Sequence, residues 1–289
     1  MTIPHQSLAS ILEASCDSAG WQWLVGQRDT IAKRVSEDLN PLYIALAMAR
    51  RKVGDGPIMT DAQGTASNPV AQWRCDEAAR IYLLYLFLNN GPLSRQSIIQ
   101  EAYARGDEYE KEAILKGLCL LDPDGELKAL AVDACRTNVH TLLSSIGMEN
   151  TYPNMFFTEH EFNQLTLKSL FLGFGVDRIL GLRERRNTEM SRMCYDYLRE
   201  RLAADRIPPS TIWLTIDLQS DPLAEEQFIR YLSDHSLHQR KYVAMSLSWQ
   251  APIPHGLKDA VEQHLLHEED PEIKNTLMAA ISDEHIAER

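Results

Sequence analysis

The sequence predicts an all-α protein of stacked helical hairpins, and three observations carry this prediction. Apolar residues recur at spacings of three and four along most of the chain, which places them on one face of a helix. Clusters of Gly, Pro, Asn and Asp interrupt these segments at short intervals. No run of alternating β-branched residues is long enough to indicate a strand. We therefore expect either a HEAT-like α-solenoid or an irregular helical bundle.

The N-terminal part, residues 1–52, predicts a helical hairpin. Asn40 and Pro41 divide it, because asparagine suits an N-cap and proline suits the first helical position. Residues 53–70 lack periodicity and are rich in small and polar residues, so they predict the longest loop, which is either mobile or functional. The apolar positions that predict the first helix of the hairpin are Trp21, Leu24, Val25, Ile31, Ala32, Val35 and Leu39.

The remainder of the chain predicts central helices over 71–220 and HEAT-like hairpins over 221–289, all within a single domain 1–289. Thr158 and Glu161 form the pattern of a capping box, in which each side chain serves the other residue's backbone N–H. After the hairpin helix at 41–52, we expect helices at 71–89, 94–105, 107–120, 124–136, 138–147, 159–172, 176–183, 188–204, 209–217, 223–234, 237–249, 255–267 and 271–285.

A weak internal repeat supports the solenoid alternative. Two segments near the C-terminus share a basic-x-x-apolar-x-x-x-apolar pattern at a constant offset of 34 residues, and a third segment has the same pattern. An irregular bundle would produce matches of this quality by chance, so the bundle stays open. The matching positions are Arg240, Val243 and Leu247, then Lys274, Leu277 and Ile281, and earlier Lys111, Ile114 and Leu118.

The charge balance excludes several classes of partner. With 41 acidic against 29 basic residues the net charge is −12, which disfavours nucleic acid and anionic lipid as binding partners.

The sequence also predicts where the protein is located. The most apolar run, Ile81 to Leu88, is far shorter than the ~20 residues that cross a bilayer. Met1 to Ser10 lacks the features of a secretory signal, and the five dispersed cysteines resemble small hydrophobes in a reducing compartment. We expect a cytoplasmic protein without direct membrane insertion.

The most unusual segment follows residue 150. Between Lys168 and Lys241 there is no lysine, yet Asp177 to Arg206 holds eight arginines, a bias that suggests forked hydrogen bonding to carboxylate or phosphate groups. Six acidic residues share the window, so pairing along helix faces, for example at Asp196, is the commoner explanation. The best candidates for an anion site lie at a helix-to-helix junction: Arg183, Arg185, Arg186 and Asn187.

Lys168 is a second anomaly, because it is the only charge in the apolar stretch 165–174. Such a lysine extends to solvent, pairs, or lowers its pKa. Together with Asn163 and an arginine it would form a polar pocket in an apolar wall, as is common in small-molecule sites. Polar residues at two connectors either cap helices or converge on this region, where Asn150 and Tyr152 would lie at the rim of the pocket. The predicted ligand-binding residues are Arg136, Asn138, Asn150, Tyr152, Asn163, Lys168, Arg186, Asn187 and Arg192.

Catalytic chemistry has little support in the sequence. The pairs His235/His238 and His264/His267 each offer two metal ligands, whereas a metal site needs three or four. No nucleophile elbow, Walker loop or dinucleotide fingerprint occurs. The run from Asp76 to Arg80 either brings acids to a cleft or forms an i,i+4 ion pair. We therefore predict no catalytic residue, no metal and no cofactor.

A set of motifs marks the central region of the chain: Arg136–Asn138, Glu149–Pro153, Phe162–Gln164, Leu167–Phe171, Arg186–Asn187, Glu189, Arg192–Met193, Asp196–Tyr197 and Glu200–Arg201, with Asp76–Arg80 further upstream. Together these motifs resemble the EboA family of metabolite-traffic proteins, most strongly over residues 130–215. The resemblance implies a role in moving a secondary-metabolite precursor, with proteins of the same bacterial gene cluster as partners, and it implies no established catalytic activity.

Three hypotheses follow, in this order. The first is a non-enzymatic binding or scaffold protein that holds an anionic or polar small metabolite or docks a cluster partner. The second is a hydrolase or isomerase in which Lys168 or a nearby acid acts as base. The third is a structural helical-repeat protein that works through an interaction surface alone.

Overall fold

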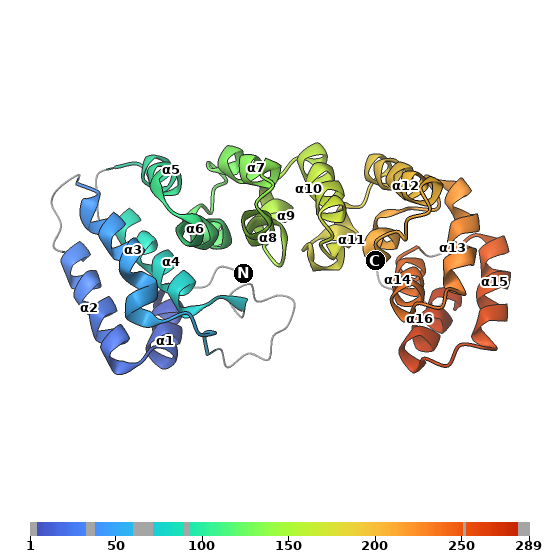
Figure 1. Cartoon of the computed structure of the whole chain (residues 1–289), viewed down its shortest axis with the longest axis horizontal. Coiled ribbons are helices and arrows are strands. Elements are labelled where there is room, and N and C mark those ends of the chain that lie inside the picture. Colours follow the sequence, from blue (N-terminus) through green and yellow to red (C-terminus); the bar gives the residue numbers. More distant parts are fainter. Residues whose placement is uncertain (1–4, 33–37, 60–71, 90–92, 251–252, 283–289) are drawn as a thin grey trace. The chain divides into compact units, whose positions relative to one another are not determined.

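Helices form the regular secondary structure of the chain, as predicted, and the fold is all-α (Figure 1). The computed structural model describes residues 5–32, 38–59, 72–89, 93–250 and 253–282. Within these ranges the only β pairing is an isolated bridge between Pro57 and Arg74. Contacts divide the chain into two compact units, 1–157 and 158–289. Each unit is described by itself below, and a single domain over 1–289 stays a prediction.

Helix α4 forms the centre of the first unit, where it contacts α1, α2, α3, α5 and α6. Its sequence is apolar on nearly every side after the first turn, and such a helix is stable only when other helices surround it. Ile81, Leu83 and Leu84 are fully buried as a result. The helices of this unit are α1 (His5–Ser15), α2 (Ser18–Ala32), α3 (Asn40–Val53), α4 (Cys75–Leu88), α5 (Arg95–Arg105), α6 (Glu108–Leu121), α7 (Lys128–Arg136), α8 (His140–Gly147) and α9 (Tyr152–Phe156).

Helix α14 has the central place in the second unit, where it packs against α13, α16 and η3. Trp213 on η3 is fully buried there, and its Nε1–H donates to Oε1 of Gln239 at 2.7 Å. The elements of this unit are α10 (Glu159–Phe171), η2 (Val176–Arg178), α11 (Leu182–Arg185), α12 (Thr188–Ala203), η3 (Ser210–Thr215), η4 (Pro222–Ala224), α13 (Glu225–Leu232), α14 (Leu237–Ser248), α15 (His255–Leu265) and α16 (Pro271–Ile281).

Local capping signals in the sequence predicted two helix starts, and one of the two is correct. The backbone N–H of Glu161 donates to Oγ1 of Thr158 at 3.3 Å, and the N–H of Thr158 donates to the Glu161 carboxylate at 2.7 Å. The predicted capping box is therefore confirmed. The N-cap predicted at Asn40 is wrong: Asn40 is the first residue of α3, Pro41 follows in the first turn, and the N-cap is Leu39. The N–H of Asn40 donates instead to Oδ1 of Asp38 at 3.0 Å.

Other boundaries differ from the prediction for identifiable reasons. The helix expected at 124–136 begins at Lys128, because the Asp122 carboxylate accepts the N–H groups of Glu126 (3.1 Å) and Leu127 (2.8 Å) and holds a turn there. The single helix expected at 176–183 is wrong. It is replaced by η2 and α11, which are separated at Gly181, whose φ of 80° lies in the left-handed region. Helices α1 and α9 were not predicted.

Part of the loop predicted at 53–70 lies outside the described residues, which resume at residue 72. Its first residues are anchored to the start of α4. The N–H of Ile58 donates to the carbonyl of Trp73 at 3.2 Å, and the N–H of Cys75 donates to the carbonyl of Gly56 at 2.8 Å. Ile58 and Trp73 are both buried. Residues 53–59 therefore form an ordered connection from the end of α3, and the role of the rest of the predicted loop stays open.

The positions of the predicted repeat lie on helices that pack against each other. Val243 and Leu247 on α14 and Leu277 on α16 are all fully buried, and these two helices share an extensive interface. A regular HEAT-like solenoid nevertheless stays a prediction. Within the described residues, no helix combines the length and the hydropathy that crossing a bilayer requires.

Candidate functional site

Two asparagines join α10 to the start of α12 within the second unit. Nδ2 of Asn163 donates to Oδ1 of Asn187 at 3.0 Å, and Nδ2 of Asn187 donates back to Oδ1 of Asn163 at 2.9 Å. Asn187 is also the N-cap of α12, because its Oδ1 accepts the N–H of Met190 at 2.9 Å. Asn163 is almost fully buried. Two of the predicted site residues therefore lie together, 24 positions apart in the chain.

Arg186 lies between α11 and α12, next to this amide pair in the sequence. It is half-buried, and its Nη1 is a buried atom with no hydrogen-bond partner among the described residues. Burial lowers the pKa of the guanidinium, the charge of Asp217 opposes this effect, and the like charge of Arg183 adds to it. Arg183 itself lies over the ring of Trp249, 5.9 Å from its centroid. The predicted helix junction thus carries a cation that is incompletely compensated.

A network of hydrogen bonds among hydroxyl and carboxylate groups connects the start of α12 to the segment that follows η3. The Ser191 hydroxyl accepts the N–H of Asp217 at 2.8 Å and donates to the Asp221 carboxylate. The Ser220 hydroxyl donates to Oδ2 of Asp217 at 2.7 Å and lies 3.1 Å from the Thr188 hydroxyl. These bonds hold in place the carboxylate whose charge acts on Arg186. Sequence reasoning did not identify this segment, because its serines and aspartates are typical of any turn.

Lys168 lies in the last turn of α10 and is half-buried. A contact of the Lys168 ammonium group with Asn163 or Arg186 stays a prediction. Arg192 belongs to a different environment, because it is exposed on α12 and forms ion pairs with Glu189 at 2.7 Å and with Asp196 at 3.5 Å. Asp196 also pairs with Arg199 at 3.7 Å. Arg192 therefore forms surface ion pairs, as the acidic residues between Asp177 and Arg206 indicated.

The other four predicted residues belong to the first unit, so a site shared with the second unit stays a prediction. Asn150 and Tyr152 were expected at the rim of a pocket, but both are buried. Nδ2 of Asn150 donates to the carbonyls of Leu115 (3.0 Å) and Ser145 (2.9 Å). The Tyr152 hydroxyl donates to Asp122, and burial together with this bond raises the pKa of the phenol. Both side chains therefore have structural roles.

Arg136 and Asn138 lie at the surface of the first unit, at and after the end of α7. Nη1 of Arg136 pairs with the Asp133 carboxylate at 3.0 Å, one turn earlier on the same helix. Both members of the pair are largely exposed, and such pairs contribute little to stability.

A buried charge cluster at the start of α4 is the most extensive electrostatic feature of the first unit. Asp76, fully buried, pairs with Arg80 at 2.5 Å and with Arg74 at 3.1 Å. Glu77, also fully buried, pairs with Arg74 at 2.9 Å and with Lys116 on α6 at 2.8 Å. The sequence left two alternatives for this run, a cleft lined by acids or an i,i+4 ion pair. The pair of Asp76 and Arg80 is the second alternative, and both acids are paired with basic side chains.

Glu112 completes this cluster from α6 and was not identified from the sequence. Its carboxylate lies 3.5 Å from Nη2 of Arg74. Burial raises its pKa, and the charge of Glu77 adds to the shift, whereas Arg74 and Lys116 oppose it. Arg80 also donates from Nε to the carbonyl of Leu46 at 3.1 Å, so the cluster connects α3, α4 and α6. Its internal pairing indicates a structural role.

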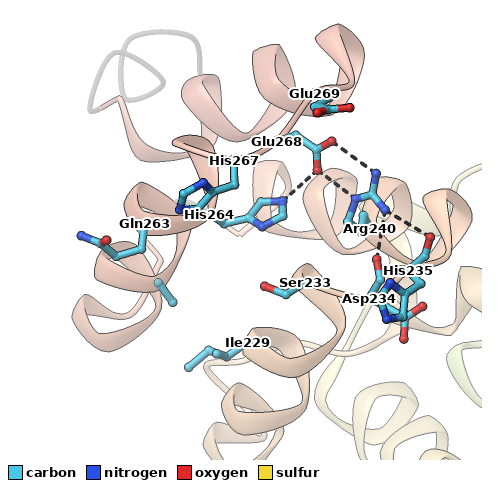
Figure 2. Close-up of a pocket in the computed structure, with 11 residues that line it drawn as sticks. Ile229, Ser233, Asp234, His235, Arg240, Gln263, His264, His267, Glu268 and Glu269 are labelled. Atoms are coloured by element: carbon cyan, nitrogen blue, oxygen red, sulfur yellow. Dashed lines mark hydrogen bonds and ion pairs between the residues drawn. The ribbon is translucent and has the colours of Figure 1, made fainter.

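A cavity of the second unit lies near the C-terminus and has a volume of about 680 Å³ (Figure 2). Its centre is an ion-paired group: the Glu268 carboxylate accepts from Nε of Arg240 at 2.9 Å and lies 2.8 Å from Nε2 of His264. Sequence reasoning considered His264 only as a possible metal ligand. No group of three or more His, Cys, Asp or Glu side chains in the described part of the chain is placed to hold a metal ion.

Comparison with known proteins gives one match. The family described as "Metabolite traffic protein EboA" matches residues 5–217, which is most of the chain. No curated protein and no solved structure matches the chain. The matched range includes the Asn163–Asn187 pair, Arg186 and the buried charge cluster, and it ends before the cavity around Glu268.

Proposed function

We propose that this chain, which belongs to the EboA family of metabolite traffic proteins, is a non-enzymatic protein that binds an anionic or polar small metabolite at Arg186. The proposed site consists of the guanidinium of Arg186, the neighbouring Arg183 and the amide pair of Asn163 and Asn187. It lies inside the part of the chain that matches the family.

The observation that carries the proposal is the buried Nη1 of Arg186, which has no hydrogen-bond partner among the described residues. A buried donor without a partner costs about 1–3 kcal/mol, and more when the group is charged. An oxygen of a phosphate or carboxylate would satisfy this donor and would also reduce the repulsion between Arg186 and Arg183. Asp217 compensates this charge only in part, because burial still lowers the pKa of Arg186.

The chemistry of these side chains favours binding over acid–base catalysis. Arginine and asparagine donate hydrogen bonds without exchanging protons near neutral pH. A general acid or base works best when its pKa lies near the working pH, and neither residue type has such a pKa. The amide pair fixes the backbone on both sides of residue 186, since Nδ2 of Asn187 also donates to the carbonyl of Arg185 at 3.0 Å. The binding groups are therefore held in position before a ligand arrives.

The test is an NMR titration of the protein with inorganic phosphate and, separately, with acetate, observing the arginine side-chain signals. The wild type should show a saturable shift of the Arg186 signal. In Arg186→Gln the affinity, followed on the signal of the neighbouring Arg183, should fall about tenfold or more, because a charge-assisted hydrogen bond contributes about 1.5–3 kcal/mol.

Arg192→Gln is the matched control, because Arg192 is an exposed arginine on the neighbouring helix with its own acidic partners. Its phosphate affinity should stay within about twofold of wild type, as expected for an exposed pair. The proposal is wrong if neither anion gives a saturable shift, or if both variants lose the same affinity. A thermal melt of each variant checks that the fold is retained.

A Lys168→Met variant separates this proposal from the enzyme alternative, in which Lys168 acts as base. Anion binding at Arg186 should persist in this variant, because the proposed contacts belong to residues 183–187 and to Asn163. Complete loss of binding in Lys168→Met, with an intact thermal melt, would instead favour a site in which the lysine contacts the ligand.

A further inference from the structure

The cavity around Glu268 lies between α13 and α15 and the segment that leads into α16 (Figure 2). Its volume of about 680 Å³ falls in the range of small-molecule sites, which is about 300–1,000 Å³. It lies beyond residue 217, where the family match ends, so the family description does not assign it. It is also separate in the chain from the site proposed at Arg186.

A polar stripe on α15 and the turn that follows it explains why the two helices leave a space between them. Ala260, Gln263, His264 and His267 recur at spacings of three and four, which is the pattern that normally carries the apolar face of a packed helix. Here three of the four are polar. The apolar contacts of α15 are made on another face, where Leu257 and Val261 are fully buried. The polar stripe therefore lines the cavity and does not seal it.

Glu268 holds the lining in one arrangement. Its carboxylate accepts hydrogen bonds from Arg240 at 2.9 and 3.3 Å and from the backbone N–H of Asp270 at 3.0 Å, and its Oε2 lies 2.8 Å from Nε2 of His264. Burial disfavours ionisation of Glu268, but these bonds outweigh it and lower its pKa to about 2. An ionised carboxylate can only accept, so Nε2 of His264 donates to it. The second ring nitrogen is then directed away from Glu268 (Figure 2).

The charged groups that remain for a ligand are carboxylates. The guanidinium of Arg240 is engaged by Glu268 and by the carbonyls of Asp234 (3.0 Å) and His235 (3.4 Å). The lining otherwise presents the carboxylates of Asp234 and Glu269, the imidazoles of His235, His264 and His267, and the neutral polar side chains of Ser233 and Gln263. Three carboxylates stand against one guanidinium, so the cavity is negative when the imidazoles are neutral. An anionic ligand is disfavoured there, and a cationic donor is favoured.

From this lining we infer that the cavity binds a small molecule that carries a protonated amine. The ammonium group would pair with the exposed carboxylate of Glu269, and the hydrogen-bonding side chains of the α15 stripe would contact the remainder of the ligand. Ile229 supplies an aliphatic wall from α13. The site proposed at Arg186 selects for the opposite charge, so the two inferences can fail independently.

The test uses three linear four-carbon probes of different charge: 1,4-diaminobutane, 1,4-butanediol and succinate. Each is titrated into the full chain at pH 7.5 and physiological salt, and binding is followed by isothermal calorimetry and by the NMR signals of the His264 ring. Saturable binding of the diamine alone, with a shift at His264, is expected. Saturable binding of succinate at His264, or an absence of diamine binding, would overturn the inference.

Glu269→Gln and Glu272→Gln form a matched pair, because both remove one exposed carboxylate and only Glu269 lines the cavity. Diamine affinity should fall about tenfold in Glu269→Gln, which corresponds to about 1.4 kcal/mol, and should change by less than about twofold in Glu272→Gln. Equal losses in both variants would mean general attraction to an acidic surface and would contradict the inference. Ser233→Phe, which adds volume at the α13 side without changing charge, should abolish the His264 shift.

Discussion

Asn163 and Asn187 bind each other through two reciprocal amide hydrogen bonds of 3.0 and 2.9 Å, and this pair fixes the start of α12 to α10. The bonds are made on a nearly fully buried Asn163, where each amide replaces water for the other. Because Asn187 also caps α12, one side chain serves both the helix start and the interhelical contact.

Asn163→Ala should destabilise the second unit by about 1–3 kcal/mol, because the Asn187 amide loses its partner in a buried setting. Urea denaturation measures this loss. Gln164→Ala, at the exposed neighbouring position, should change stability by less than about 0.5 kcal/mol. A double-mutant cycle with Asn187→Ala should give a coupling of at least about 0.5 kcal/mol, and strict additivity would contradict a direct interaction.

Asp76→Asn should destabilise the first unit by about 3–5 kcal/mol, because it leaves the buried guanidinium of Arg80 uncompensated. Differential scanning calorimetry measures the fall in melting temperature. The control is Asp133→Asn, which removes the exposed pair with Arg136 and should cost no more than about 1 kcal/mol. Similar losses in the two variants would show that burial of the charge cluster has no energetic consequence.

Gly125→Ala should destabilise the protein by at least about 1–2 kcal/mol, because Gly125 has a φ of 76° in the left-handed region. A Cβ there would also lie 2.4 Å from Cδ1 of Phe156, so the ring would have to move. Gly26→Ala is the opposite case: no atom lies within 4 Å of its added Cβ in α2, and it should stabilise by about 0.5–1 kcal/mol. Chemical denaturation of both variants tests the contrasting signs.

Glu268 should make the stability of the second unit depend on pH under acidic conditions. Its pKa is lowered from 4.5 to about 2 in the folded chain, since the bonds from Arg240, Asp270 and His264 outweigh the effect of burial. A depressed folded pKa contributes stability that is present above pH 4.5 and is lost as the pH falls toward 2. The stability difference between wild type and Glu268→Gln, measured by urea denaturation from pH 6 to 2.5, should therefore shrink as the pH falls. A difference that stays constant would show that Glu268 is not held by these bonds.

Local patterns in the sequence identified most elements of the fold and some contacts within them. The spacing of apolar residues identified most helices, and Thr158 and Glu161 identified the start of α10, because capping depends on residues three apart. The pair of Asp76 and Arg80 was foreseen as one of two alternatives for the same reason. Short-range geometry is determined by the helix itself, so a single sequence carries it.

The packing of helices decided the remainder, including most of the candidate sites. Asn163 and Asn187 were predicted as site residues because both carry polar amide side chains. Only the packing of α10 against α12 brings the two amides into contact. Asn150 and Tyr152 were assigned to a pocket rim, whereas packing buried them. Glu112 and Glu268 were not predicted as site residues. Arg74 lies 38 positions from Glu112, and Arg240 lies 28 positions from Glu268. No local pattern exists for such separations, although His264 pairs with Glu268 at a spacing of four. Burial and charge compensation over such separations arise only when the helices are assembled.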